Sequence, residues 1–190
     1  MCYRGLTALL LVVVVLTAVT LLRPWLDPDV RPSIEQLPGI TVHGLNRQAI
    51  DFAALQGRPL LVTFWSITCA SCVKEIPHLV ELYERHTRDG LAIVGVSSPQ
   101  DLPHRVVEFV REYGIPYPVA LDVEARAQKA FGGVFVTPTT FLFAADGELV
   151  FKTVGPFDKD QVEQLVVKLL SRQGGEEAGP AAHSTRQEQR

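Results

Sequence analysis

The chain has 190 residues, of which 47% are apolar, and its formal net charge at pH 7 is −3. This length suits one domain with a hydrophobic core and a short additional segment. The small net charge and the lack of a basic stripe argue against nucleic acid as a partner. The three cysteines, Cys2, Cys69 and Cys72, are too few for a disulfide scaffold, which needs several bridges between distant segments.

The N-terminal segment is the most apolar part of the chain. Residues 6–22 read LTALLLVVVVLTAVTLL, and at about 1.5 Å per helical residue they span about 26 Å, just enough for a bilayer core. A clean A-x-A-like site is lacking, so we expect an uncleaved transmembrane signal anchor, with a cleaved signal peptide as the alternative. Residues 1–5 then form a cytoplasmic tail. The predicted location is the inner membrane, single-pass, with the large domain facing the periplasm or another extracytoplasmic side.

Two flanking segments differ from the rest in composition. Residues 23–38 are rich in proline and acidic residues, which indicates a linker between the anchor and the domain. Residues 173–190 contain no apolar residue other than alanine, so we expect a disordered tail. The predicted folded domain therefore covers residues 39–172.

Strand and helix patterns alternate along that domain. Buried strands are predicted at 59–65 and 91–97, and further strands at 117–121, 138–143 and 148–154. Helices are predicted at 72–86, 102–113, 124–131 and 158–170. The Asp146-Gly147 step predicts a hairpin between the last two strands, and Asp158 is the expected N-cap of the last helix. This order predicts an α/β sandwich with a mixed sheet.

Two cysteines three positions apart lie where the first buried strand gives way to a helix. The stretch 64–77 reads FWSITCASCVKEIP, so the helix starts at or just after Cys69. Backbone amides at a helix start stabilise negative charge, and we expect them to stabilise a thiolate at Cys69. Cys72, one turn further, should be more shielded and should displace whatever becomes attached to Cys69. This asymmetry is what thiol–disulfide exchange requires.

Other uses of a cysteine pair fit less well. Zinc needs four ligands, and no ligand set with the pair is formed by His78, His86 and His104. Copper binding usually adds methionine or histidine beside the thiols. The only methionine is Met1, and no histidine lies within five residues of either cysteine. A thiol peroxidase would carry a proline upstream, where this chain has Val62.

The motifs FW-x3-CxxC-x2-E-x-P, then VTPTTFLF and DG, occur in this order along residues 64–147. In this the chain resembles the membrane-tethered thioredoxin-like proteins of bacterial envelopes, the TlpA/ResA/CcmG group, over about residues 39–172. The resemblance implies a thioredoxin fold, in which helices flank a central mixed sheet, with an N-terminal membrane anchor helix. It also implies an inserted strand-helix unit, which residues 117–131 match.

The resemblance assigns roles to four residues around the pair. It makes Cys69 the nucleophile and Cys72 the resolving thiol. It makes Pro138 the cis-proline that faces the disulfide. A cis bond there would expose the backbone of Thr137 for strand-like pairing with a substrate. An ordinary trans peptide at the start of a strand is the alternative for Thr137-Pro138.

Two further residues have open interpretations. Glu75 matches an acidic residue of the ResA-like branch, and three positions along a helix put it on the face of Cys72. There it could raise the pKa of that thiol and carry its proton, although a solvated surface glutamate is the alternative. Trp65 is expected to pack beside the active-site loop and contact substrate, unless it is simply a core aromatic. Thr63 stands where thioredoxin has a buried aspartate, and Thr68 where a tryptophan is common.

The resemblance further implies an envelope protein-disulfide oxidoreductase that reduces disulfide-bearing client proteins. Cytochrome c maturation is the task that the resemblance suggests. A reductase outside the cytoplasm needs electrons, so a membrane thiol donor of the DsbD/CcdA type is the implied partner. We expect no metal and no cofactor other than the redox-active disulfide Cys69–Cys72. Two rival hypotheses remain: a dithiol oxidase of secreted proteins, and a copper- or thiol-binding chaperone without turnover.

Overall fold

The computed structural model describes residues 13, 16–18 and 34–176, and the chain divides into two units, Met1–Ser33 and Ile34–Arg190. In the first unit the described residues are helical, and the Thr17 hydroxyl donates a hydrogen bond to the carbonyl oxygen of Val13. The rest of the predicted anchor, the tail 1–5 and linker residues 23–33 lie outside the described residues. Within the described part of the chain, no helix is both long and apolar enough to cross a membrane.

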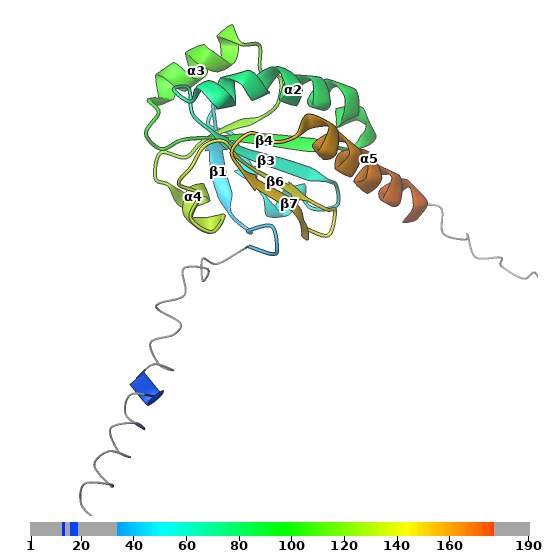
Figure 1. Cartoon of the computed structure of the whole chain (residues 1–190). Coiled ribbons are helices and arrows are strands. Elements are labelled where there is room, and N and C mark those ends of the chain that lie inside the picture. The colour runs from blue at the N-terminus through cyan, green and yellow to red at the C-terminus, as the bar shows by residue number, and fades with distance from the viewer. Residues whose placement is uncertain (1–12, 14–15, 19–33, 177–190) are drawn as a thin grey trace, which may run out of the picture. The chain divides into compact units, whose positions relative to one another are not determined.

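The second unit is built on one seven-stranded mixed sheet in the order β2-β1-β5-β4-β3-β6-β7 (Figure 1). Neighbours β3, β4 and β5 are parallel, and the other pairs are antiparallel. The strands are β1 (Thr41–Gly44), β2 (Ala49–Asp51), β3 (Leu60–Trp65), β4 (Ala92–Ser97), β5 (Val119–Leu121), β6 (Thr139–Phe143) and β7 (Leu149–Val154). The helices are η1 (Ala53–Leu55), α2 (Ala70–His86), η2 (Thr87–Asp89), α3 (Pro103–Glu112), α4 (Arg126–Ala130) and α5 (Lys159–Glu176).

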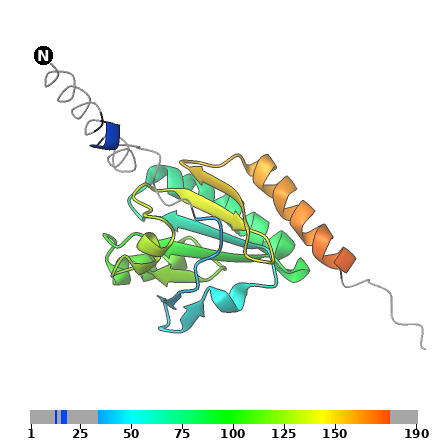
Figure 2. The same cartoon turned by 90° about the horizontal axis from the view of Figure 1, so that it is seen from below.

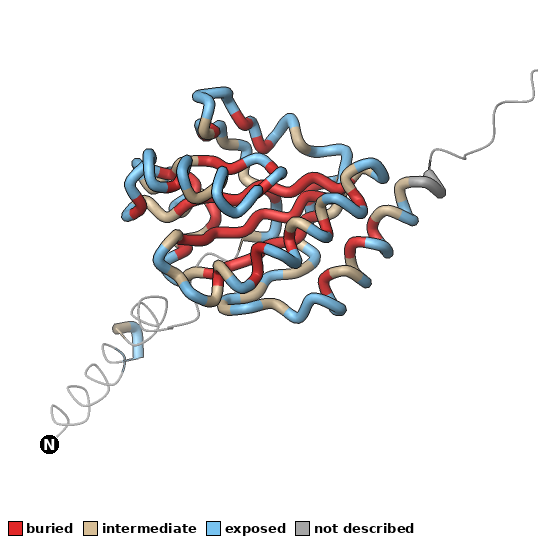
Figure 3. Tube along the Cα trace, turned by 90° about the horizontal axis from the view of Figure 1, so that it is seen from above, coloured by how far each residue is buried: buried red, intermediate tan, exposed pale blue. Residues whose placement is uncertain are grey.

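Helices cover both faces of the sheet, as the buried strand patterns predict. Alternate side chains of each central strand point to opposite faces, so Leu61 of β3 packs with α2, α3 and α5. Its neighbours Leu60 and Val62 pack with α4 and with the segment before β3. Figure 2 shows the same two layers from another side, and Figure 3 shows that the central strands form the most buried part of the domain. The predicted α/β class with a mixed sheet is therefore confirmed.

A cluster of phenylalanines fills the core beneath α4. The ring of Phe131 lies edge-on to Phe52 and Phe64, with centroids 5.2 Å away in both cases. It also contacts Phe141 at 5.4 Å and Phe143 at 6.0 Å. Phe131 is fully buried and is followed directly by the loop that leads to β6. The core therefore fixes where that loop begins.

The start of the domain lies earlier than predicted. Residues 34–38 were expected in the linker, but Leu37 is buried and its amide donates to the carbonyl oxygen of Gly147 at 2.8 Å. Gln36 forms a bridge with Glu148. The apolar residues Ile34 and Leu37 draw this segment onto the core, where it extends the hairpin of β6 and β7. The β1–β2 hairpin is a further element that the sequence patterns did not reveal.

Two other boundaries also differ from the prediction. The tail was expected to be disordered from residue 173, but α5 continues to Glu176, and the side chain of Gln173 donates to the carbonyl oxygen of Gly57 at 2.7 Å. Residues 177–190 lie outside the described part. In the predicted inserted unit, α4 begins at Arg126 rather than 124, because the buried Asp122 accepts hydrogen bonds from the amides of Ala127 and Gln128.

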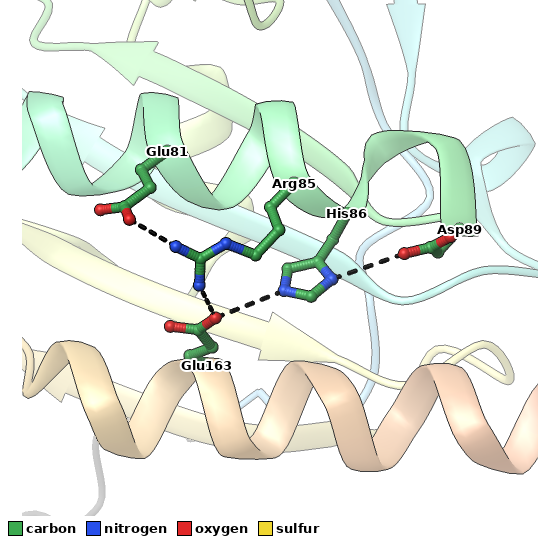
Figure 4. A network of polar contacts seen from close by, with 5 residues as sticks. All are labelled: Glu81, Arg85, His86, Asp89 and Glu163. Carbon is green, nitrogen blue, oxygen red and sulfur yellow. Dashed lines mark hydrogen bonds and ion pairs between the residues drawn. The ribbon is translucent and has the colours of Figure 1, made fainter.

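A polar network joins α2 to α5 at the end of α2 away from the cysteines (Figure 4). Arg85 donates to the carboxylates of Glu81 and Glu163. The buried His86 lies 3.6 Å from Glu163 through Nε2 and 3.6 Å from Asp89 through Nδ1. The hydrogen bond from Arg85 lowers the pKa of Glu163. This network holds the C-terminal end of α2 against α5. The cysteine pair lies at the opposite, N-terminal end of α2.

Candidate functional site

The cysteine pair lies at the junction of β3 and α2. Cys69 has extended backbone angles and is the N-cap of α2, and the amide of Cys72 points to its sulfur at 3.2 Å. The two cysteines form a disulfide, with Cα atoms 5.2 Å apart. Cys69 is half-buried, whereas Cys72 is only 2% exposed. The predicted asymmetry in access between the two sulfurs is therefore present.

The loop before β6 faces this disulfide from another part of the chain. The Thr137–Pro138 peptide bond is cis, as predicted. The carbonyl oxygen of Thr137 lies 3.5 Å from the sulfur of Cys69, and Thr137 is half-buried while Pro138 is buried. Antiparallel pairing of β6 with β3 produces this approach, because Thr139 stands opposite Phe64. The prediction that the Thr137 backbone lies beside the sulfurs is confirmed.

Glu75 is not the solvated surface residue of the alternative interpretation, since it is only 5% exposed. Its carboxylate accepts a hydrogen bond from the amide of Phe157 at 2.7 Å. Burial raises the pKa of Glu75, and this hydrogen bond partly opposes the rise. The charge of Glu75 adds to burial in raising the pKa of Tyr117. Glu75 thus shares the helix of Cys72, but its hydrogen bond is to the segment between β7 and α5.

Trp65 is a core aromatic that also reaches the site. It is 4% exposed and packs against Phe109 with ring centroids 5.4 Å apart. Its indole nitrogen has no hydrogen-bond partner among the described residues. A Cβ atom on Gly95 would lie 3.0 Å from that nitrogen, so a side chain at this position would crowd the indole ring. Trp65 also lines the hollow beside Cys69.

A buried carboxylate that sequence reasoning missed holds the loop before Cys69. Asp101 is 8% exposed and accepts hydrogen bonds from the Ser66 hydroxyl at 2.8 Å and from the Ile67 amide at 3.1 Å. The Ser66 oxygen in turn accepts from the Thr68 amide at 3.2 Å. Asp101 follows β4, the parallel neighbour of β3, and such strand ends meet at one edge of a sheet. The position of Asp101 after the strand that neighbours β3 is the sequence signal that could have identified this residue.

Beside the disulfide is an open hollow of about 290 Å³. Cys69, Thr68, Trp65, Gln128, Phe135 and Thr137 are among the residues that line it. None of its described lining residues carries a charge. Phe135 is 80% exposed, and no motif in the sequence pointed to it. Cys69 therefore borders this hollow, whereas Cys72 is not among the residues that line it.

Two other sequence-based expectations concern the chemistry of the site. Thr63, at the position of the buried aspartate of thioredoxin, is 1% exposed and accepts a hydrogen bond from the Thr140 hydroxyl at 3.2 Å. A neutral hydroxyl pair therefore occupies that position. Among the described residues, no group of three or more histidine, cysteine, aspartate or glutamate residues is placed to hold a metal ion.

An accessible cysteine at a helix start, bonded to a buried partner and faced by a cis-proline loop, defines a thioredoxin-like protein built for thiol–disulfide exchange. Residues 32–168 match the Redoxin family, and the chain belongs to that family. Within it the chain is a thioredoxin-like protein of the ResA/CcmG type and a protein-disulfide oxidoreductase.

Known relatives agree with this assignment. The chain is 32% identical over 137 residues to the thiol-disulfide oxidoreductase ResA of Bacillus thuringiensis (strain Al Hakam), covering 71% of this chain and 77% of ResA. A solution structure of a putative thioredoxin from Neisseria meningitidis is 26% identical, with a TM-score of 0.67, covering 80% of this chain and all of that one (100%). A thiol:disulfide interchange protein of the thioredoxin family from Chlorobium tepidum TLS is 27% identical, with a TM-score of 0.63, covering 75% of this chain and 99% of that one.

Proposed function

We propose that the protein reduces disulfides in client proteins, with Cys69 as the attacking sulfur and Cys72 as the resolving sulfur. One observation carries this assignment of roles. Cys69 is half-buried at the edge of an open hollow, whereas Cys72 is 2% exposed beneath it. Only the first sulfur is accessible to a client, and only the second is close enough to displace the client afterwards.

The exchange proceeds in two balanced steps. The Cys69 thiolate attacks one sulfur of the client disulfide, so that a mixed disulfide forms while the other client sulfur leaves as a thiolate and takes up a proton. Cys72 then loses its proton and attacks the sulfur of Cys69. The second client sulfur leaves, and two electrons have passed to the client. The protein is left with the Cys69–Cys72 disulfide, which is the state in the structure.

Neighbouring groups support these steps. Glu75 lies on the same helix as Cys72, and its burial raises its pKa, which makes its carboxylate a better proton acceptor near neutral pH. We assign it the proton of Cys72. The Thr137 backbone lies beside Cys69 and can pair with an extended client segment. No cofactor other than the cysteine pair enters this scheme.

The reducing direction is supported by the charges around the pair. Two acidic residues near the pair are buried. Glu75 lies on α2, the helix of Cys72, and Asp101, in the loop after β4, accepts a hydrogen bond from the Ile67 amide in the loop before Cys69. No described lining residue of the hollow is cationic. Negative charge disfavours thiolates and so favours the disulfide, which makes the dithiol a better electron donor. The amide of Cys72 at the Cys69 sulfur acts in the opposite direction. A dithiol oxidase is therefore the rival that the measurement must exclude.

The proposed setting is the extracytoplasmic face of the inner membrane, with residues 6–22 as the anchor. The apolar run in the sequence and the resemblance to the membrane-tethered TlpA/ResA/CcmG group support this setting. A domain outside the cytoplasm needs a source of electrons, so a membrane thiol donor of the DsbD/CcdA type is the proposed partner. Cytochrome c maturation is the proposed pathway, because it is a task of the group that the sequence resembles.

The direction is tested by the equilibrium potential of the cysteine pair against glutathione. A value near or below that of thioredoxin, about −270 mV, supports a reductase, whereas a value near that of DsbA, about −120 mV, supports an oxidase. Cys69→Ser should abolish dithiothreitol-coupled reduction of insulin, and the matched control Cys2→Ser should retain it. Full activity of Cys69→Ser would rule the mechanism out. Cys72→Ala should accumulate mixed disulfides on Cys69 and so capture the clients.

A further inference from the structure

An aromatic side chain stands exposed at the mouth of the redox site. Phe135 is 80% exposed, and the next residue, Val136, is 54% exposed. Both precede Thr137, whose carbonyl oxygen lies 3.5 Å from the sulfur of Cys69. Single exposed apolar residues are ordinary on protein surfaces. Two in succession, beside the one sulfur that a client can reach, are not explained by the packing of the domain.

The loop that carries Phe135 is firmly held. The backbone carbonyl of Gln128 accepts hydrogen bonds from the amides of Gly133 and Val134, both at 3.0 Å, and its side chain donates to the carbonyl oxygen of Val134. Val134 is 7% exposed and belongs to the core. On the other side, the Thr139 hydroxyl donates to the carbonyl oxygen of Val136 at 2.6 Å. Phe135 is thus an exposed residue between two anchored neighbours.

A glycine makes room for the aromatic ring. Gly133 has a φ of +78°, and a Cβ atom there would lie 3.0 Å from Cε2 of Phe135. The ring therefore rests over the backbone of Gly133 and does not enter the core. A side chain that is already placed loses little conformational freedom when a partner covers it. An exposed ring held in one place in this way is suited to binding a partner and adds little to the core of the domain.

The surroundings define the chemistry of the occupant. None of the described residues that line the hollow is charged, so they offer no ionic partner to an acidic or basic client segment. An extended chain advances about 3.3 Å per residue. A client side chain within two residues of the attacked cysteine is therefore within reach of a ring that lies two residues before Thr137.

We infer that Phe135 is a specificity-determining residue that binds an aliphatic or aromatic side chain within two residues of the client cysteine. The inference rests on the proposed function and adds the class of client that the site prefers. Phe135 acts by binding the client beside the reacting sulfur and takes no part in the electron transfer itself.

The test uses two synthetic peptides with one disulfide each, one with leucine and one with serine two residues from each cysteine. The reduced protein should reduce the leucine peptide about tenfold faster in kcat/KM, and Phe135→Ala should remove this preference. Phe135→Leu should keep most of it. Val167→Ala, which truncates an apolar residue 48% exposed on α5, is the matched control and should leave the preference unchanged.

A small polar disulfide such as bis(2-hydroxyethyl) disulfide, which carries no apolar side chain and is too short to pair with the loop, should react equally fast with wild type and Phe135→Ala. If Phe135→Ala keeps the leucine preference, or slows the small disulfide as much as the peptides, the inference is wrong. If wild type reduces both peptides at one rate, the inference fails while the proposed function stands. If wild type reduces neither peptide, the proposed function fails and the inference fails with it.

Discussion

Replacing Asp101 with alanine tests whether the loop before Cys69 is held by that buried carboxylate. The substitution removes the acceptor of two hydrogen bonds, from the Ser66 hydroxyl and the Ile67 amide. Hydrogen bonds to charged groups contribute about 1.5–3 kcal/mol each. The Ser66 hydroxyl can turn to the Thr68 oxygen, 3.0 Å away, whereas the Ile67 amide has no such second acceptor among the described residues. We therefore expect a loss of about 3 kcal/mol in the free energy of unfolding.

Urea denaturation of the oxidised protein measures this loss. With an m-value of about 2 kcal/mol per molar, the unfolding midpoint should fall by about 1.5 M. Asp101→Asn keeps one carbonyl acceptor and should lose about half as much. The matched control is Asp51→Ala, which removes an exposed carboxylate that accepts one hydrogen bond, from the Ala53 amide at 3.0 Å. If Asp101→Ala costs no more than Asp51→Ala, the carboxylate does not hold the loop.

Three further predictions concern the surroundings of the site. Because burial raises the pKa of Glu75, its protonated form is favoured on folding, so its contribution to stability is present at low pH and is lost as the pH rises through the folded pKa. Glu75→Gln should therefore raise the melting temperature at pH 7.5 and leave it unchanged near pH 4; a variant less stable at pH 7.5 would contradict this. Thr63→Val leaves the buried Thr140 hydroxyl without its partner and should lower the free energy of unfolding, measured in urea, by about 1–2 kcal/mol. The double variant with valine at both positions should recover most of that loss. Equal losses in the single and double variants would refute the pairing. Phe131→Ala opens a cavity among four other phenylalanine rings and should lower the free energy of unfolding by about 3–5 kcal/mol in the same assay. A loss below about 1 kcal/mol would show that the cluster does not support the loop before β6.

Local sequence signals predicted the parts of the site that depend on chain order. The position of Cys69 at a helix start follows from a buried strand running directly into a helical pattern, and the structure has this junction. The Asp-Gly hairpin is likewise local, since the Glu148 amide donates to the Asp146 carboxylate at 3.0 Å and Gly147 has a φ of +85°. The cis bond before Pro138 was expected only because the chain resembles a known group of proteins.

Features that depend on tertiary contacts could not be read in the same way. Asp101 lies 35 residues from its partner Ser66, and a single acidic residue after a strand resembles any loop residue until the strand neighbours are known. The exposure of Phe135 depends on the positive φ of Gly133 and on the hydrogen bonds to Gln128. The start of the domain at Ile34 was missed because two apolar residues within a proline-rich and acidic stretch carry no periodicity.

The central claim is that Cys69, and not Cys72, is the sulfur that reacts with a client. Reduce the protein, expose it briefly to iodoacetamide at neutral pH, and quantify the label on each cysteine by mass spectrometry. We predict that Cys69 is alkylated at least about tenfold faster than Cys72, which should label readily only after unfolding. Equal rates, or faster labelling of Cys72, would contradict the account.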